Sequence, residues 1–150
     1  MIINAEIEPT SKRDKIIYQV SEIKDYVDYI NVPDNPFGQI KASSLAISIL
    51  IKSLNVEPIL HIRTIDRNLH AIKSEIYGAL LFNIKNILLV KGDIPLNSDF
   101  EKINNLKLEK VVSSISEDNK LKDINLGLPL INFSKYDIKL SERLNSRANF

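Results

Sequence analysis

The sequence predicts an α/β protein built around a parallel β-sheet. Short apolar segments alternate with helical patterns in the order strand, helix, strand, helix. The predicted strands end near residues 8, 32, 62 and 90, a spacing of roughly 25 to 30 residues that suits one strand–helix unit with its return connection. The segment NILLV is apolar after its first residue, as is typical of a strand covered on both faces. This order implies parallel strands joined by right-handed crossovers.

Turn residues mark where the predicted strands end. Pro9 closes the first strand, and Pro33 and Gly38 stop the second. Gly92 and Pro95 follow the fourth strand and end it in the same way. The four strands are expected at Ile2–Ile7, Tyr29–Val32, Pro58–Ile62 and Asn86–Val90.

Three helices are expected between these strands. The first follows Ser11, a candidate N-cap, and its apolar residues recur at near-helical spacing. The second covers Ser43–Leu54, and the third covers Asn68–Phe82 behind a cap built from Asp66 and Asn68. The expected inner face of the second helix comprises Leu45, Ile49 and Leu50.

The pattern loosens after Pro95. Phe100–Ile115 is compatible with a helix or a short strand, and Ile124–Leu130 with another strand. A short helix is expected at Lys139–Ser146, followed by residues that look like the entrance to a further strand.

The composition is that of an ordinary globular protein, with 44% hydrophobic and 26% charged residues among 150. Lys and Arg number 20 and Asp and Glu 19, a net charge of +1, so we expect no nucleic-acid partner and no polybasic membrane anchor. The chain lacks Cys, which excludes disulfide scaffolds and thiolate metal sites. No targeting segment or bilayer-length apolar run is found. We expect one cytoplasmic domain over residues 1–150.

Several familiar site motifs are missing. The sequence contains neither GxGxxG after the first strand nor GxxxxGK[ST], so a dinucleotide fingerprint or a P-loop is not expected. It also lacks GxSxG, which argues against a Ser-His-Asp hydrolase. No spacing of His and carboxylate residues is of the metal-ligand type, and we expect no metal.

Polar residues gather instead where the predicted strands end. Ligands of parallel α/β proteins bind at the carboxyl ends of the strands. Polar strand ends beside apolar strand bodies are therefore typical of the rim of an active site. The polar residues in these positions are Glu6, Glu8, Asn31, Asp34, Asn35, His61, Arg63, Thr64, Asp66, Arg67, Lys91 and Asp93.

Four segments follow one another across about residues 3 to 95: AEIEP, DYINVPDNP, EPILHIRTIDRN and AIKSEIYGALLFNIKNILLVKGDIP. In this order they resemble the methylenetetrahydrofolate reductase family. The resemblance implies a (β/α)8 TIM barrel, of which this chain would supply roughly the first four to five βα units, its amino-terminal half. It also implies FAD at the top of the barrel and NADH or NADPH as hydride donor. The implied substrate is 5,10-methylenetetrahydrofolate or a related pterin, reduced to the 5-methyl form.

The resemblance also implies roles for individual residues. Glu6 looks like the general acid that protonates the folate nitrogen, and Asp93 like the carboxylate that stabilises the iminium cation. Pro33 stands where some relatives place a cofactor-contacting Thr, and Arg143 matches a family Lys near the flavin phosphates or ribityl chain. The implied cofactor contacts are Pro33, His61, Arg63, Val90, Lys91, Gly92 and Arg143.

Each of the three central residues also has a plainer interpretation. Glu6 could be a surface residue of an edge strand, and His61 a satisfied core histidine. Asp93 after Gly92 could be an ordinary turn residue.

A closed barrel needs about 250 residues, so a chain of 150 is expected to be a fragment, one half of a split enzyme or a shortened protein. A half-barrel has two open sheet edges and an uncovered inner face. We therefore expect a homo-oligomer or a complementary half-barrel subunit. Two other functions remain open: a catalytically silent half-barrel in a regulatory or assembly role, and a different TIM-barrel enzyme of one-carbon or pterin chemistry.

Overall fold

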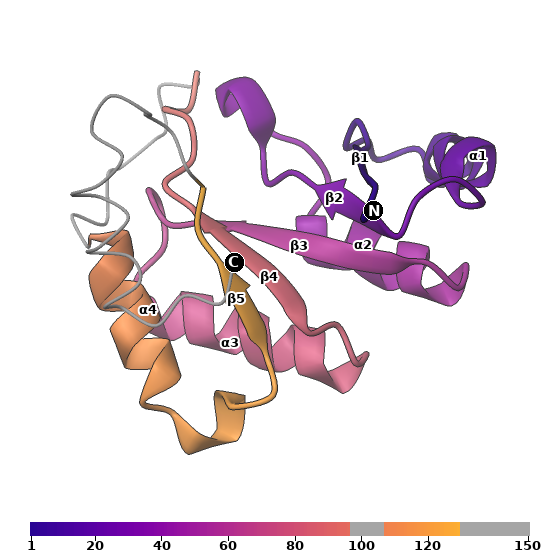
Figure 1. The fold of residues 1–150 in the computed structure, drawn as a ribbon. Coiled ribbons are helices and arrows are strands. Elements are labelled where there is room, and N and C mark those ends of the chain that lie inside the picture. The colour runs from indigo at the N-terminus through magenta and orange to yellow at the C-terminus, as the bar shows by residue number, and fades with distance from the viewer. Residues whose placement is uncertain (97–106, 130–150) are drawn as a thin grey trace.

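The computed structural model describes residues 1–96 and 107–129. Its centre is a single parallel sheet of five strands in the order β1-β2-β3-β4-β5 (Figure 1). The strands are β1 (Asn4–Glu6), β2 (Tyr29–Val32), β3 (Glu57–Arg63), β4 (Asn86–Val90) and β5 (Asn125–Gly127). The helices are α1 (Arg13–Ile23), α2 (Ser44–Ser53), α3 (Leu69–Leu81) and α4 (Leu108–Ser116), with short 3₁₀ turns η1 (Pro36–Gly38) and η2 (Asn119–Leu121).

Each strand pairs in parallel with the next one along the chain. This is the arrangement of successive βα units in a barrel, and it confirms the predicted parallel α/β architecture. The helix option for Phe100–Ile115 is confirmed in its described part by α4, and the predicted strand at Ile124–Leu130 is confirmed by the shorter β5. The helix predicted at Lys139–Ser146 lies outside the described residues.

Two helices begin at the predicted caps. The Ser43 side chain accepts a hydrogen bond from the Ala46 N–H at 3.4 Å, and Asn68 Oδ1 accepts one from the Ala71 N–H at 2.9 Å. Both bonds satisfy an amide that the first turn of a helix leaves without an internal partner. The cap residues therefore fix where α2 and α3 start.

Two other cap predictions are wrong. The N-cap position of α1 is Lys12 and makes no side-chain cap hydrogen bond, so Ser11 is not the cap. Asp66 does not cap α3, because its carboxylate instead pairs with the guanidinium of Arg63. That pairing draws Asp66 toward β3 and leaves Asn68 alone as the cap.

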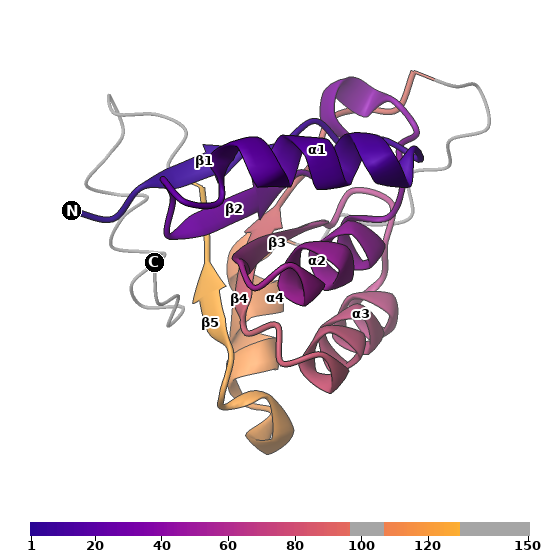
Figure 2. The same ribbon diagram turned by 90° about the vertical axis from the view of Figure 1, so that its right-hand side faces the viewer.

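The described helices α1 to α4 all cover the same face of the sheet. Val32, Leu60, Ile87 and Leu126 lie opposite one another in the strand register, and all four belong to the buried cores beneath the helices. Figure 2 shows α2 and α3 together on one side of strands β3 and β4, to their right in this view. Side chains at alternate strand positions therefore point toward the helices, and those between them point to the other face.

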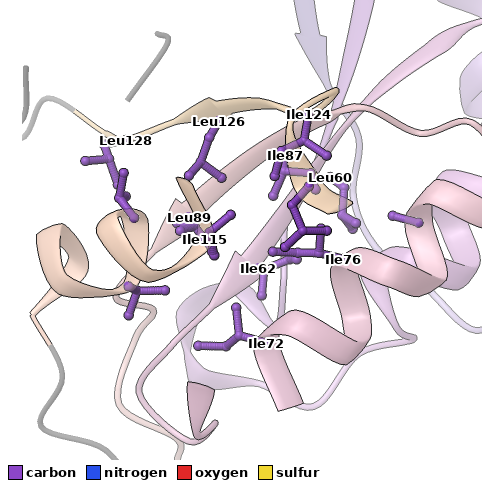
Figure 3. Close-up of a cluster of buried hydrophobic side chains, with 14 of the residues drawn as sticks. Leu60, Ile62, Ile72, Ile76, Ile87, Leu89, Ile115, Ile124, Leu126 and Leu128 are labelled. Carbon is purple, nitrogen blue, oxygen red and sulfur yellow. The ribbon is translucent and has the colours of Figure 1, made fainter. Parts of the chain in front are cut away.

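The core has two parts. The larger lies between β3, β4, β5 and helices α3 and α4, where Ile72, Ile76 and Ile115 point toward the strand side chains (Figure 3). The smaller lies between β1, β2 and helices α1 and α2. Helix α2 borders both parts, and its buried apolar residues are Ile47 and Ile51. The predicted inner face of this helix is wrong, since Leu45, Ile49 and Leu50 are only partly buried at its flanks.

Strand β4 shows how the two faces differ. Ile87 and Leu89 are fully buried beneath the helices. Asn86, Leu88 and Val90, which alternate with them, are half-buried on the opposite face. The continuous apolar sequence of this strand predicted equal cover on both faces, and the structure gives full burial only on the helix side.

Candidate active site

The predicted site residues lie at or just beyond the carboxyl ends of β1 to β4. Glu6 is the last residue of β1, and Val90 is the last residue of β4. His61 lies near the end of β3, which finishes at Arg63. Pro33 follows β2 directly, and Lys91, Gly92 and Asp93 follow β4. Arg143 lies outside the described residues.

Glu6 and His61 lie on the face of the sheet that the helices do not cover. Glu6 pairs in register with Asn31 on β2, and Asn31 pairs with Ile59 on β3. His61 is two positions beyond Ile59, so its side chain lies on the same face of the sheet. Glu6 is exposed, whereas Asn31 and His61 are half-buried. The structure therefore brings the predicted acid and the predicted histidine to one face of three adjacent strands.

Asn31 connects these strands. Its Oδ1 atom lies 3.1 Å from His61 Nε2, and its Nδ2 atom donates to the Ala5 carbonyl at 3.4 Å. The sequence marked Asn31 only as one of many polar residues at strand ends and gave it no role. The signal that identifies it is the register, which sets Asn31 beside Glu6 and within reach of His61.

Burial keeps His61 neutral. It lowers the pKa of the imidazole from 6.5 to about 4, because removing the ring from water disfavours its charged form. At neutral pH the ring therefore donates from one nitrogen and accepts at the other. A neutral imidazole on this face suits hydrogen bonding to an uncharged group of a ligand.

Asp93 is held by a loop from another part of the sheet. Its Oδ2 atom accepts a hydrogen bond from the Phe37 N–H at 2.7 Å, which ties the segment after β4 to the segment after β2. The Leu96 N–H donates to the Gly38 carbonyl at 3.1 Å. Gly38 has φ +67, and a Cβ there would lie 2.1 Å from the Ile94 carbonyl oxygen. The two loops are in contact because residue 38 has no side chain.

An ion-pair cluster joins the segment after β2 to the end of β3 and the segment that follows it. The Asp34 side chain is 2% exposed, and its Oδ2 atom accepts from Arg67 Nη1 at 2.6 Å and from the Arg63 N–H at 3.0 Å. The guanidinium of Arg63 pairs in turn with Asp66. Arg63 therefore has a structural role in this structure, and its contact with a cofactor stays a prediction.

The backbones after β3 and β4 approach each other closely. The amide of Thr64 donates to the Val90 carbonyl at 3.0 Å, and the amide of Ile65 to the Lys91 carbonyl at 3.0 Å. Gly92 has φ +86, and a Cβ built on it would lie 2.8 Å from the Arg63 Cβ. The Lys91–Gly92 peptide is thereby fixed against β3, while the Lys91 side chain is exposed.

The predicted site thus has two parts. Glu6 and His61 share the sheet face through Asn31, and Asp93 lies in the contact between the two loops. Within residues 1–96 and 107–129, no hydrogen bond joins Asp93 to Glu6 or to His61.

Comparison with known protein families gives a match to the family model described as methylenetetrahydrofolate reductase, over residues 9–128. The chain belongs to the methylenetetrahydrofolate reductase family. The matched region contains β2 to β5, while Glu6 precedes it and Arg143 follows it. Comparison with curated protein sequences gives no match.

Membership of this family accounts for the parallel α/β architecture and indicates the general class of reaction. The family is built on TIM barrels, and five parallel strands alternating with helices correspond to part of one. The family is one of oxidoreductases that act on methylenetetrahydrofolate. The described helices include none long and apolar enough to cross a membrane. Over the same residues, no group of three or more His, Asp or Glu side chains is placed to hold a metal ion.

Proposed function

We propose that this chain takes part in the flavin-dependent reduction of 5,10-methylenetetrahydrofolate, or a related pterin, to the 5-methyl form, with NADH or NADPH as hydride donor. Family membership supports the reaction class. The observation that carries the proposal for this chain is the placement of a carboxyl group, Glu6, and a neutral imidazole, His61, on the same uncovered sheet face. The proposed setting is cytoplasmic one-carbon metabolism.

The residues at this end of the sheet fit FAD. A flavin ring is flat and largely apolar, with hydrogen-bonding groups along one edge, and His61 and the half-buried Val90 offer matching chemistry. The proposed contacts are Pro33, His61, Arg63, Val90, Lys91, Gly92 and Arg143. When bound, FAD supplies a carrier that accepts hydride from the nicotinamide and delivers it to the pterin.

Glu6 and Asp93 supply the proposed acid and electrostatic functions. Glu6 protonates the substrate nitrogen whose bond to the methylene carbon breaks, which opens the five-membered ring. The carboxylate of Asp93 stabilises the iminium cation that results. The hydrogen bond from the Phe37 N–H fixes one oxygen of Asp93, so the carboxylate needs no reorientation when the cation forms.

The experiment measures flavin binding and folate reduction separately. We expect the chain, together with its complementary half-barrel, to bind FAD, to be bleached by reduced nicotinamide and to reduce methylenetetrahydrofolate. Glu6→Gln should lose folate reduction by a factor of about 100 or more while it keeps flavin binding. Glu57→Gln is the matched control, because Glu57 is exposed at the opposite end of the sheet and pairs with Lys52. Unchanged folate reduction by Glu6→Gln would show that the acid assignment is wrong.

A second candidate function is that of a catalytically silent half-barrel that assembles with or regulates a partner. The observation in its favour is a group of exposed apolar side chains on the two loops in contact: Phe37, Ile40, Ile94 and Leu96. Two results together would favour this function over the first. The protein would stay colourless when FAD is added, and the Asp93→Asn variant would bind a partner barrel as well as the unmodified protein does.

A further inference from the structure

Asn31 has the hydrogen-bonding groups needed to choose the tautomer of His61. A neutral imidazole carries its proton on one of two nitrogens, and the hydrogen bond made by one nitrogen decides which. Nε2 of His61 lies 3.1 Å from Asn31 Oδ1. A carboxamide oxygen can only accept, so this contact requires the proton on Nε2.

The orientation of the Asn31 amide is itself fixed. Its Nδ2 atom donates to the Ala5 carbonyl at 3.4 Å. Rotating the amide by half a turn would bring Oδ1 to the Ala5 carbonyl and set two acceptors against each other. Since Ala5 lies within β1, the backbone of that strand orients the amide that faces His61.

We propose that Asn31 is a positioning residue that holds His61 as the neutral Nε2–H tautomer and so presents Nδ1 as a hydrogen-bond acceptor to the ligand of this site. Across the described part of the chain, Nδ1 of His61 makes no hydrogen bond. An acceptor here selects a ligand group that donates, such as a ring N–H or a sugar-like O–H. The identity of that ligand rests on the proposed function, whereas the tautomer rests on the contacts alone.

The chain is well suited to a direct measurement, because it has only two histidines. His70 is exposed on α3 and provides an internal reference signal. Long-range ¹⁵N–¹H correlation spectra of the full chain distinguish Nε2–H, Nδ1–H and imidazolium forms by their ring-nitrogen shifts. We expect His61 to be a single Nε2–H species at pH 7, and Asn31→Ala to give a mixture of the two neutral tautomers.

Asn31→Asp provides the second arm. It keeps the size of the side chain but places a carboxylate at Nε2, which should raise the pKa of His61 by about 1 to 3 pH units. Asn86→Asp is the matched control, since Asn86 also pairs in register with Ile59 on the same face, but its Oδ1 atom accepts a hydrogen bond from Asn125 Nδ2 and not from His61. The control should move the pKa of His61 by much less.

Three results would overturn the proposal: His61 as the Nδ1–H tautomer, a mixed population in the unmodified protein, or equal titration of His61 in the Asn31→Asp and Asn86→Asp variants. If His61 is the Nε2–H tautomer but the chain fails to bind FAD together with its complementary half-barrel, the proposed function is rejected and this inference stands. If Asn31→Asp does not fold, the spectrum of the unmodified chain alone still decides the tautomer.

Discussion

Replacing Gly92 with Ala should destabilise the protein by about 2 to 5 kcal/mol. The added Cβ would lie 2.8 Å from the Arg63 Cβ, closer than two carbons approach without repulsion. Overpacking of this kind costs about 1 to 3 kcal/mol. The backbone at Gly92 has φ +86, where an L-residue costs a further 1 to 2 kcal/mol, roughly.

The repulsion has no easy route of relief, because Arg63 is fixed in place. The position of its Cβ is set by strand β3, and its amide donates to Asp34 Oδ2 at 3.0 Å. A rotamer change in Arg63 therefore leaves the close contact unchanged, and relief requires the segment after β4 to move away from β3. That movement would disturb Asp93, the residue next in the chain.

Urea unfolding monitored by circular dichroism measures the effect, with Gly78→Ala as the control. Gly78 lies within α3, and its added Cβ would meet only the flexible end of Leu45, at 3.2 Å from Cδ2. Removing a helical glycine gains about 1 kcal/mol, so we expect Gly78→Ala to stay within about 1 kcal/mol of the unmodified protein. Equal effects of the two substitutions, or a Gly92→Ala loss below about 0.5 kcal/mol, would refute the reasoning.

Three further predictions concern charge, pH and association. Asp34→Asn should cost about 3 kcal/mol in urea unfolding, because it removes the buried negative charge to which Arg67 Nη1 and the Arg63 N–H donate. Glu8→Gln, which changes an exposed ion pair, should have a much smaller effect on unfolding. Because the pKa of His61 falls from 6.5 to about 4 on folding, its contribution to the free energy of unfolding should be fully present above pH 6.5 and should fall by about 3 kcal/mol toward pH 4. Unfolding curves of His61→Gln measured across this pH range should lack that drop. An identical drop in the variant would contradict the assignment. β1 and β5 form the edges of the described sheet, so sedimentation should show association at micromolar concentration, and a compact monomer would contradict this.

The sequence predicted the order of elements well because each local pattern agreed with the fold. Tyr29–Val32 and Asn86–Val90 begin and end where expected. The first strand is shorter than expected because only Asn4–Glu6 pairs with β2, and Ile2 and Ile3 stay exposed. How far a strand extends depends on its partner, and no pattern within the strand itself reports that.

The site was predictable as a region but not as a set of contacts. Polar residues at strand ends located it, since parallel strands bring their carboxyl ends to one edge. The contact between Asn31 and His61 joins residues 30 positions apart, and only the strand register creates it. The bond from the Phe37 N–H to Asp93 spans 56 positions and depends on two loops meeting. Neither partner carries a local signal for the other.

Strand β2 shows how one short segment serves both the fold and the proposed site. Ile30 and Val32 are fully buried beneath the helices, while Asn31 between them reaches the opposite face and His61. Alternation along a strand makes this division possible, because neighbouring side chains never share a face. A change of Ile30 or Val32 should therefore act through stability, and a change of Asn31 mainly through the protonation of His61. The fold specifies where Asn31 stands, and the hydrogen bonds of Asn31 specify the chemistry that His61 offers there.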